Sequence, residues 1–133
     1  LKKRGWGVTM THGITYGYDH FKSADILWEH LNKVKALEDQ VWVGTFREVA
    51  AYEKEREALR YEVVKKKNGF IVRTQLLLDK VLFTEPLTGV IDQKNIKSIK
   101  ITQGEKKLKP RIVTGKVLFD FDPYGKEIDI TIK

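Results

Sequence analysis

The sequence contains no cysteine among its 133 residues, which excludes disulfide bonds and thiolate metal sites. It has no apolar run near the roughly 20 residues that a membrane-spanning helix needs, and no signal-peptide pattern opens the chain. We therefore expect no membrane span. The chain begins without methionine and reaches an apolar alternation within its first residues, which predicts a piece of a longer protein.

Positive charge is abundant but unevenly distributed. The formal net charge is +7: residues 1–60 carry 10 basic and 9 acidic side chains, whereas residues 61–133 carry 15 and 9. Many lysines lie near expected turns, as in "KKK" at 65–67, and lysines at sheet edges and hairpin tips keep a sheet soluble. Because no aromatic residues are interleaved with the basic ones on a common face, we expect no nucleic-acid partner.

A hydrophobic fraction of 41% is enough for a core, and the length fits one ordinary domain or two small ones. Apolar side chains recur at every second position from Trp6, and His12 ends this alternation, which predicts a strand over 6–12. The spacing i, i+4, i+7 then predicts a helix that begins after Ser23. Its apolar face is formed by Leu27, Leu31 and Val34.

A second strand and a second helix follow. "VWV" at 41–43 predicts a very short buried strand, and Thr45 with Glu48 forms a capping box that opens a helix reaching about Arg60. The run from Glu53 to Glu57 is expected to be a solvated face of this helix. Strand, helix, strand, helix is the repeat of an α/β fold with parallel strands, and two such units need further units to pack against.

From residue 61 onward the apolar pattern changes to period two, which predicts an antiparallel β-rich module. Asn68-Gly69 marks a hairpin turn, and "DPYG" at 122–125 marks a β-turn. The alternating apolar residues near the end are Val117, Phe119, Phe121, Ile128, Ile130 and Ile132. We expect five or six strands in a small sandwich, with two domains, 1–60 and 61–133, that meet near residues 58–62.

His12 is the first candidate for chemistry, because in parallel α/β folds reacting groups gather at the carboxyl ends of strands. A histidine there can act as a general acid or base. The loop that follows has a composition suited to stacking on a sugar and hydrogen-bonding to it: Tyr16, Tyr18, Asp19 and His20. The alternative is that His12 only ends a strand, as His30 is expected only to pack on its helix.

The order of these features resembles the C-terminal part of a polysaccharide deacetylase of carbohydrate esterase family 4. The resemblance rests on "VTMTHGI" (8–14), "LWEHLNKVK" (27–35) and "DQVWVGTFREVAAYEKERE" (39–57), and it covers residues 5–60 well and the tail loosely. It implies an α/β plus β architecture: the last two β/α units of a distorted (β/α) barrel, followed by the small antiparallel β-sandwich-like module.

That resemblance implies metal-dependent hydrolysis of an N- or O-acetyl group on a glycan. In the family, one Asp and two His hold a divalent metal, zinc or a similar ion, which polarises the acetyl carbonyl and the attacking water. His12 matches the general acid that protonates the leaving amine or alcohol, and Met10 matches an apolar residue of the acetyl pocket. The family also implies an extracytoplasmic or cell-envelope location.

The chain departs from the family because the paired-aspartate and H-x-x-x-H metal motifs lie earlier in those proteins, and neither occurs here. We therefore expect no metal ligand in this chain, no activity from it alone, and two partners: a polysaccharide substrate and an upstream barrel segment of the same protein. Two alternatives stay open. One is a non-catalytic carbohydrate-binding module that uses Tyr16, Tyr18 and Tyr124 as stacking platforms; the other is a deacetylase-like protein without its metal site.

Overall fold

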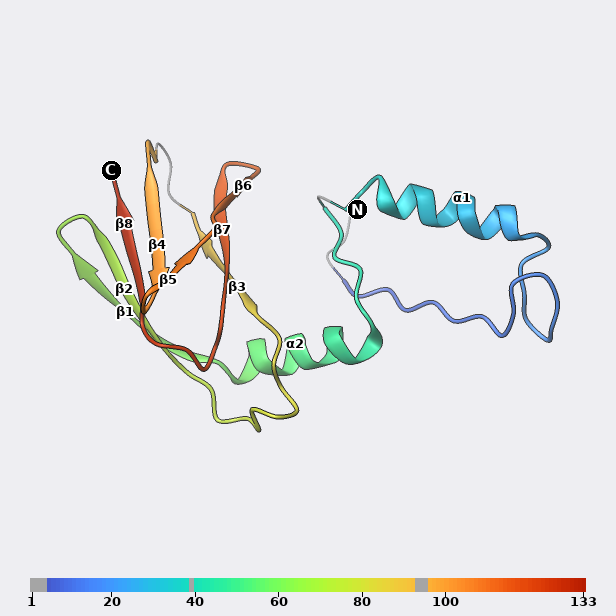
Figure 1. Ribbon diagram of the computed structural model, residues 1–133, viewed down its shortest axis with the longest axis horizontal. Coiled ribbons are helices and arrows are strands. Elements are labelled where there is room, and N and C mark those ends of the chain that lie inside the picture. The colour runs from blue at the N-terminus through green and yellow to red at the C-terminus, as the bar shows by residue number, and fades with distance from the viewer. Residues whose placement is uncertain (1–4, 39, 93–95) are drawn as a thin grey trace. The chain divides into compact units, whose positions relative to one another are not determined.

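The computed structural model describes residues 5–38, 40–92 and 96–133, which form two helices and eight strands (Figure 1). The helices are α1 (Ala24–Lys35) and α2 (Phe46–Ala58). The strands are β1 (Arg60–Lys66), β2 (Gly69–Gln75), β3 (Leu87–Ile91), β4 (Ile99–Gln103), β5 (Lys106–Leu108), β6 (Arg111–Val113), β7 (Lys116–Phe121) and β8 (Ile128–Ile132). The chain divides into a first unit, Leu1–Phe46, and a second unit, Arg47–Lys133.

In the first unit, the predicted helix is confirmed as α1, which begins directly after Ser23. Asp25 in its first turn and Lys33 and Lys35 in its last turn complement the helix dipole. All twelve residues of α1 are described, and none of them is buried. The apolar face that the sequence predicts therefore exists but is only partly covered: Leu27 and Val34 are half-buried, and Leu31 is 43% exposed.

The two strands predicted in the first unit are wrong. Residues 6–12 and 41–43 have no regular secondary structure, and their apolar side chains are mostly exposed. The physical reason is that a strand exists only through hydrogen bonds to a neighbouring strand, whereas no described segment pairs with either stretch. Alternation favours an extended backbone. Among the described residues, however, no neighbouring strand forms the hydrogen-bonded ladder that would make either stretch a strand.

The second unit is built from two open antiparallel sheets. The five-stranded sheet has the order β1-β2-β8-β4-β5, and the three-stranded sheet has the order β3-β7-β6. Every ladder between the described strands is antiparallel. The predicted (β/α) barrel portion is therefore wrong: the described chain is mostly β, with two helices and no parallel strand pair between them.

Both turn predictions are confirmed. β1 and β2 form a hairpin in which Lys66 pairs with Gly69 across the predicted turn. The amide of Gly125 donates to the carbonyl oxygen of Asp122 at 3.0 Å, which closes the predicted β-turn between β7 and β8. The period-two pattern of this region predicts which side chains face inward, although it underestimates the number of described strands.

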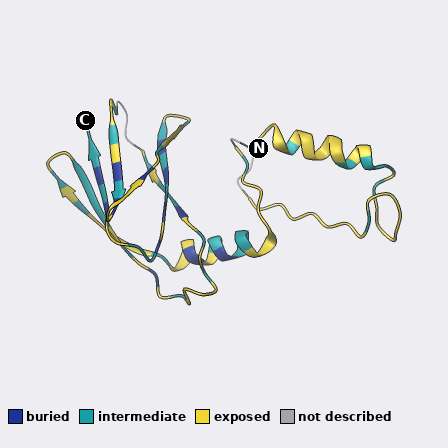
Figure 2. Cartoon of the chain, in the orientation of Figure 1, coloured by how far each residue is buried: buried dark blue, intermediate teal, exposed yellow. Residues whose placement is uncertain are grey.

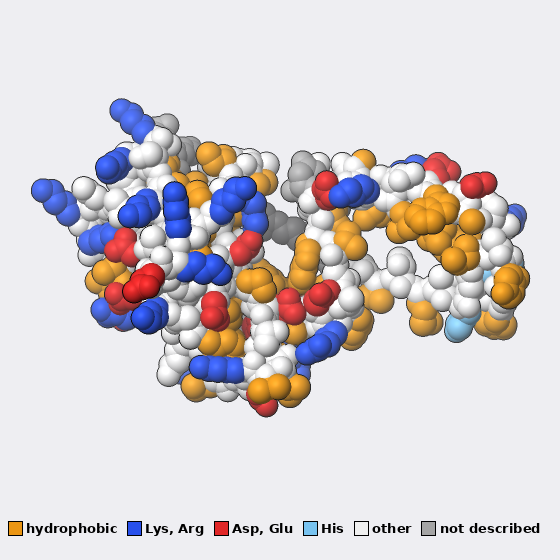
Figure 3. Space-filling model, viewed as in Figure 1, with side chains coloured by type: hydrophobic (Ala, Val, Ile, Leu, Met, Phe, Trp, Pro, Cys, Tyr) orange, Lys and Arg blue, Asp and Glu red, His pale blue; other side chains and the backbone are white. Residues whose placement is uncertain are grey.

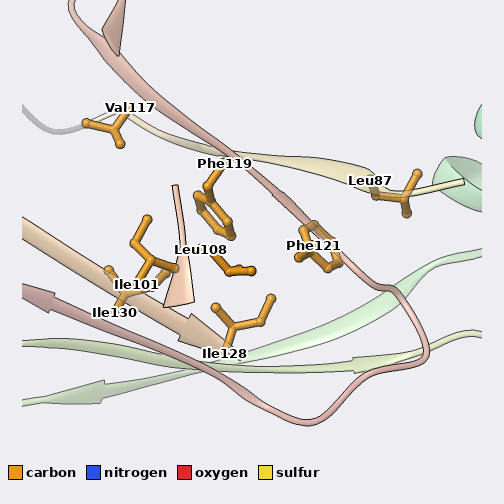
Figure 4. Packing of buried hydrophobic residues seen from close by; sticks show 8 residues of the cluster. All are labelled: Leu87, Ile101, Leu108, Val117, Phe119, Phe121, Ile128 and Ile130. Atoms are coloured by element: carbon orange, nitrogen blue, oxygen red, sulfur yellow. The ribbon is translucent and has the colours of Figure 1, made fainter. Parts of the chain in front are cut away.

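The core of the second unit lies between the two sheets (Figure 4). Its buried apolar side chains are Leu87, Ile101, Leu108, Val117, Phe119, Phe121, Ile128 and Ile130. Gly89 of β3 pairs with Phe119 of β7, and a Cβ added at Gly89 would lie 2.4 Å from the ring. Glycine is therefore needed here because the aromatic ring covers its backbone. These buried residues come from β3, β4, β5, β7 and β8.

Candidate functional site

The His12 loop, residues 12–20 of the first unit, is closed by backbone hydrogen bonds at its base. The amides of His12 and Gly13 both donate to the carbonyl oxygen of Asp19, at 3.0 and 3.1 Å. The hydroxyl of Thr11 donates to the carbonyl oxygen of Gly13 at 2.8 Å and approaches that of Asp19 at 3.1 Å. The backbone on both sides of His12 is thereby fixed, even though residues 5–11 form no strand.

Two further features hold the His12 loop in its shape. A Cβ added at Gly13 would lie 2.0 Å from the carbonyl oxygen of Tyr16, so only glycine allows the chain to fold back so closely. The Nδ1 atom of His20 lies 2.9 Å from the carbonyl oxygen of Gly17, a contact that the Nδ1–H tautomer makes as a donor. The predicted role of His20 in substrate binding stays a prediction, and in the structure its ring helps to close the loop.

The imidazole of His12 is exposed and packs edge-on against the ring of Tyr18, with centroids 6.0 Å apart and an interplanar angle of 77°. A T-shaped pair of this kind restricts the ring without using its nitrogen atoms. Within the described part of the chain, the ring nitrogens of His12 have no hydrogen-bond partner. The side chain is therefore available to exchange a proton with a bound molecule.

The other predicted site residues lie in or beside the same loop. Met10 is 80% exposed, Tyr16 is 83% exposed and Tyr18 is 96% exposed. Asp19 contributes its backbone carbonyl to loop closure, and its side chain is exposed. These residues are all exposed, and their role in substrate binding stays a prediction.

The described residues do not fit the divalent metal that the family resemblance implies. Across residues 5–38, 40–92 and 96–133, no group of three or more His, Cys, Asp or Glu side chains is arranged to hold a metal ion. His12 and His20 share a loop, but His20 already contacts the loop backbone. Any metal used with His12 would need ligands from outside the described residues.

Glu55 of α2, in the second unit, corrects the expectation of a solvated 53–57 face. Its side chain is fully buried; Oε1 accepts a hydrogen bond from the amide of Glu85 at 3.1 Å, and Oε2 has no partner among the described residues. Burial raises the pKa of Glu55, and the nearby charges of Glu85 and Asp122 raise it further, outweighing the Glu85 hydrogen bond. Sequence spacing could not reveal this carboxyl, because every residue around it in the run is charged.

The β1–β3 groove is a second feature that the sequence analysis missed. It is a cavity of about 480 Å³ in the second unit, and its lining includes Tyr61, Val63, Phe70, Val72, Leu87 and Ile91. Tyr52 and Arg56 of α2 also line it. The groove exists because the core has no buried residue from β1 or β2, so this end of the five-stranded sheet is uncovered among the described elements. The alternating apolar residues Tyr61 and Val63 are the sequence pattern that could have indicated this groove.

Comparisons of the chain with protein-family models, with curated proteins and with solved structures gave no match. Among the described residues, neither helix has the length and apolar character needed to span a bilayer.

Proposed function

We propose that the chain supplies a general-acid histidine, His12, to an enzyme that removes acetyl groups from a polysaccharide. The single observation that carries this proposal is an exposed imidazole, free of hydrogen-bond partners within the described residues, on a loop fixed by backbone hydrogen bonds. The resemblance of "VTMTHGI" to the polysaccharide deacetylases supports the assignment of the reaction. In this role the protonated imidazole of His12 transfers its proton to the leaving amine or alcohol as the acyl bond breaks.

We assign the remaining catalytic groups to a partner segment, because no group of three or more His, Cys, Asp or Glu side chains among the described residues is arranged to hold a metal ion. In the resembling family the metal-binding motifs precede the motif around His12, so the proposed partner is an upstream metal-bearing segment of the same protein. Exposed apolar side chains in the first unit, among them Trp6, Met10 and Trp28, support a partner surface there (Figure 3). The exposed rings of Tyr16 and Tyr18, on the same loop as His12, support the proposal that this loop contacts the glycan.

The test is His12→Asn in the full-length enzyme with its metal, measured as acetate released from an acetylated glycan. We expect turnover to fall by roughly 10²–10⁴, the usual contribution of a general acid, with metal content nearly unchanged. His30→Asn is the matched control, because His30 is also an exposed histidine of the first unit but lies on α1. Unimpaired turnover of His12→Asn would rule the assignment out.

A second candidate, binding of an acidic polysaccharide without catalysis, is favoured by the lysines of the second unit. Among the described residues, exposed lysines without an ion pair there include Lys65, Lys67, Lys100, Lys106, Lys107 and Lys109. Tyr124 is a poor stacking platform, because Lys80 lies 5.2 Å from its ring centroid and its hydroxyl donates to Leu78. Titration of the 133-residue chain with an anionic and a neutral glycan at two salt concentrations separates this function from the first.

A further inference from the structure

The β1–β3 groove lies where the two sheets of the second unit are unequal. Five strands face three, and β3 is an edge of the smaller sheet while β1 is an edge of the larger one. Tyr61 and Val63 of β1 line the groove and are 69% and 52% exposed. Their cross-strand partners Thr74 and Val72 line it as well. The uncovered surface therefore lies alongside a strand edge that is free among the described residues.

The free edge of β3 determines what kind of molecule fits the groove. Its five residues, Leu87–Ile91, span about 16 Å at roughly 3.3 Å per residue, and β7 uses the hydrogen-bonding groups of only one side. The amide and carbonyl groups of the opposite side pair with no described strand, and an extended polypeptide can satisfy them whereas an acyl chain cannot. Apolar side chains dominate the lining, which disfavours a hydrated glycan there.

One charged side chain beside the groove refines this choice. Lys65 follows Val63 by two positions on β1, so it shares the groove face, and it makes no ion pair with a described residue. A strand with an acidic residue opposite Lys65 would neutralise that charge.

We propose that the β1–β3 groove binds an extended polypeptide strand that pairs with the free edge of β3. The bound polypeptide becomes a fourth strand of the β3-β7-β6 sheet. Its apolar side chains, at alternate positions, cover Tyr61, Val63, Phe70 and Val72. An acidic residue at one end faces Lys65. This binding site is independent of the His12 loop and of the proposed deacetylation.

The test uses the 133-residue chain and a capped synthetic peptide, Thr-Val-Thr-Val-Thr-Val-Glu, followed by isothermal titration calorimetry. Saturable binding is expected. Because the amides of alternate strand residues point to opposite edges, the peptide is also made with N-methyl groups on its threonines and, separately, on its valines. At least one of these two peptides should bind at least about tenfold more weakly, because it cannot donate to β3. A peptide that does not bind, or one that is indifferent to N-methylation, overturns the proposal.

Two variants localise the binding. Val63→Lys places a second cation in the groove at a half-exposed position and should weaken binding about tenfold or more. Glu62→Lys is the matched control on the opposite face of β1 and should bind as the wild type does. Equal loss in both variants overturns the assignment to the groove. Two other results would also overturn it. One is binding of an N-acetylglucosamine oligomer, in place of the peptide, that is lost in Val63→Lys. The other is a dimer of the wild-type chain in sedimentation that dissociates in Val63→Lys.

Discussion

The two units of the chain use similar apolar alternation with opposite results. In the second unit, Phe119 and Phe121 of β7 are buried against a facing sheet, whereas in the first unit Trp6, Val8 and Met10 are exposed (Figure 2). Both stretches alternate with period two. What differs is the presence of a paired neighbour and of an opposing apolar layer, which β7 has and residues 6–10 lack among the described residues. Alternation indicates which side chains of a segment can be buried together. They are buried only where a paired strand and an opposing apolar layer are present.

The largest effect expected from this comparison comes from truncating an aromatic side chain in each unit. Phe119→Ala should destabilise the second unit by about 3–5 kcal/mol, because a buried ring is replaced by a cavity. Trp28→Ala, at a side chain that is 61% exposed, should change the free energy of unfolding by less than about 0.5 kcal/mol. Urea unfolding followed by circular dichroism measures both, and similar losses would contradict the contrast in packing.

Glu55 allows a test of whether water is excluded from the part of the second unit beneath α2. Its raised pKa means that the folded state holds the proton more tightly than the unfolded state, so wild-type stability should fall as the pH rises above 4.5. Glu55→Gln removes this titration. As the pH rises from 4.5 through the raised pKa of folded Glu55, the wild type should lose stability relative to the variant. Urea midpoints across that range measure the difference.

Glu57→Gln is the matched control for that experiment, because Glu57 is an exposed glutamate of the same helix. It should leave the pH dependence unchanged. If Glu55→Gln kept the wild-type pH dependence, Glu55 would be solvated in solution and the buried environment described for α2 would be wrong.

Asp120 allows a test of the charge interactions on the outward-facing side of the second unit. Burial alone would raise the pKa of Asp120, but hydrogen bonds from Arg111 at 2.6 and 3.0 Å and from Thr88 at 2.7 Å lower it overall. The stabilisation is therefore present above pH 3.8 and is lost as the pH falls through the lower folded value. Asp120→Asn should cost about 1 kcal/mol at neutral pH, with the difference from wild type closing in acid.

Arg111→Gln should reproduce that pH-dependent difference, since it removes the main partner of Asp120. Denaturant titrations at neutral and acidic pH are sufficient for both variants. A cost that persists unchanged in acid would mean that Asp120 acts through packing and not through its charge.

The smallest effect is expected on the surface of the first unit. Lys33 and Glu29 form an exposed i,i+4 pair at 2.7 Å on α1. Lys33→Ala should lower the stability of the helix by at most about 0.5 kcal/mol, and salt at about 1 M should remove even that difference. Helical circular dichroism on heating measures it. A larger loss would show that α1 is supported by more than its own surface contacts.

The sequence predicts the second unit better than the first. Alternation at Phe119, Phe121, Ile128 and Ile130 correctly marks inward-facing side chains, because each lies in a strand with neighbours on both sides. The same rule applied to residues 6–12 predicts a strand that the described residues do not form. Periodicity records the side-chain preference of a segment but contains no information about which other segment hydrogen-bonds to it.

How well the sites can be predicted also depends on whether neighbouring or distant residues form them. The His12 loop could be found because its composition is unusual, and the structure shows it closed by contacts within about ten residues of chain. Glu55 could not be found, since its burial depends on the amide of Glu85, thirty positions away. The β1–β3 groove depends on the order of eight strands, which no local pattern specifies.

The distribution of tryptophan gives the molecule a built-in optical label. Trp6, Trp28 and Trp42 all lie in the first unit, and the second unit contains tyrosine and phenylalanine but no tryptophan. Indole emission therefore reports on Leu1–Phe46 alone, without any engineered dye. A partner that covers this region should shift the emission to shorter wavelength.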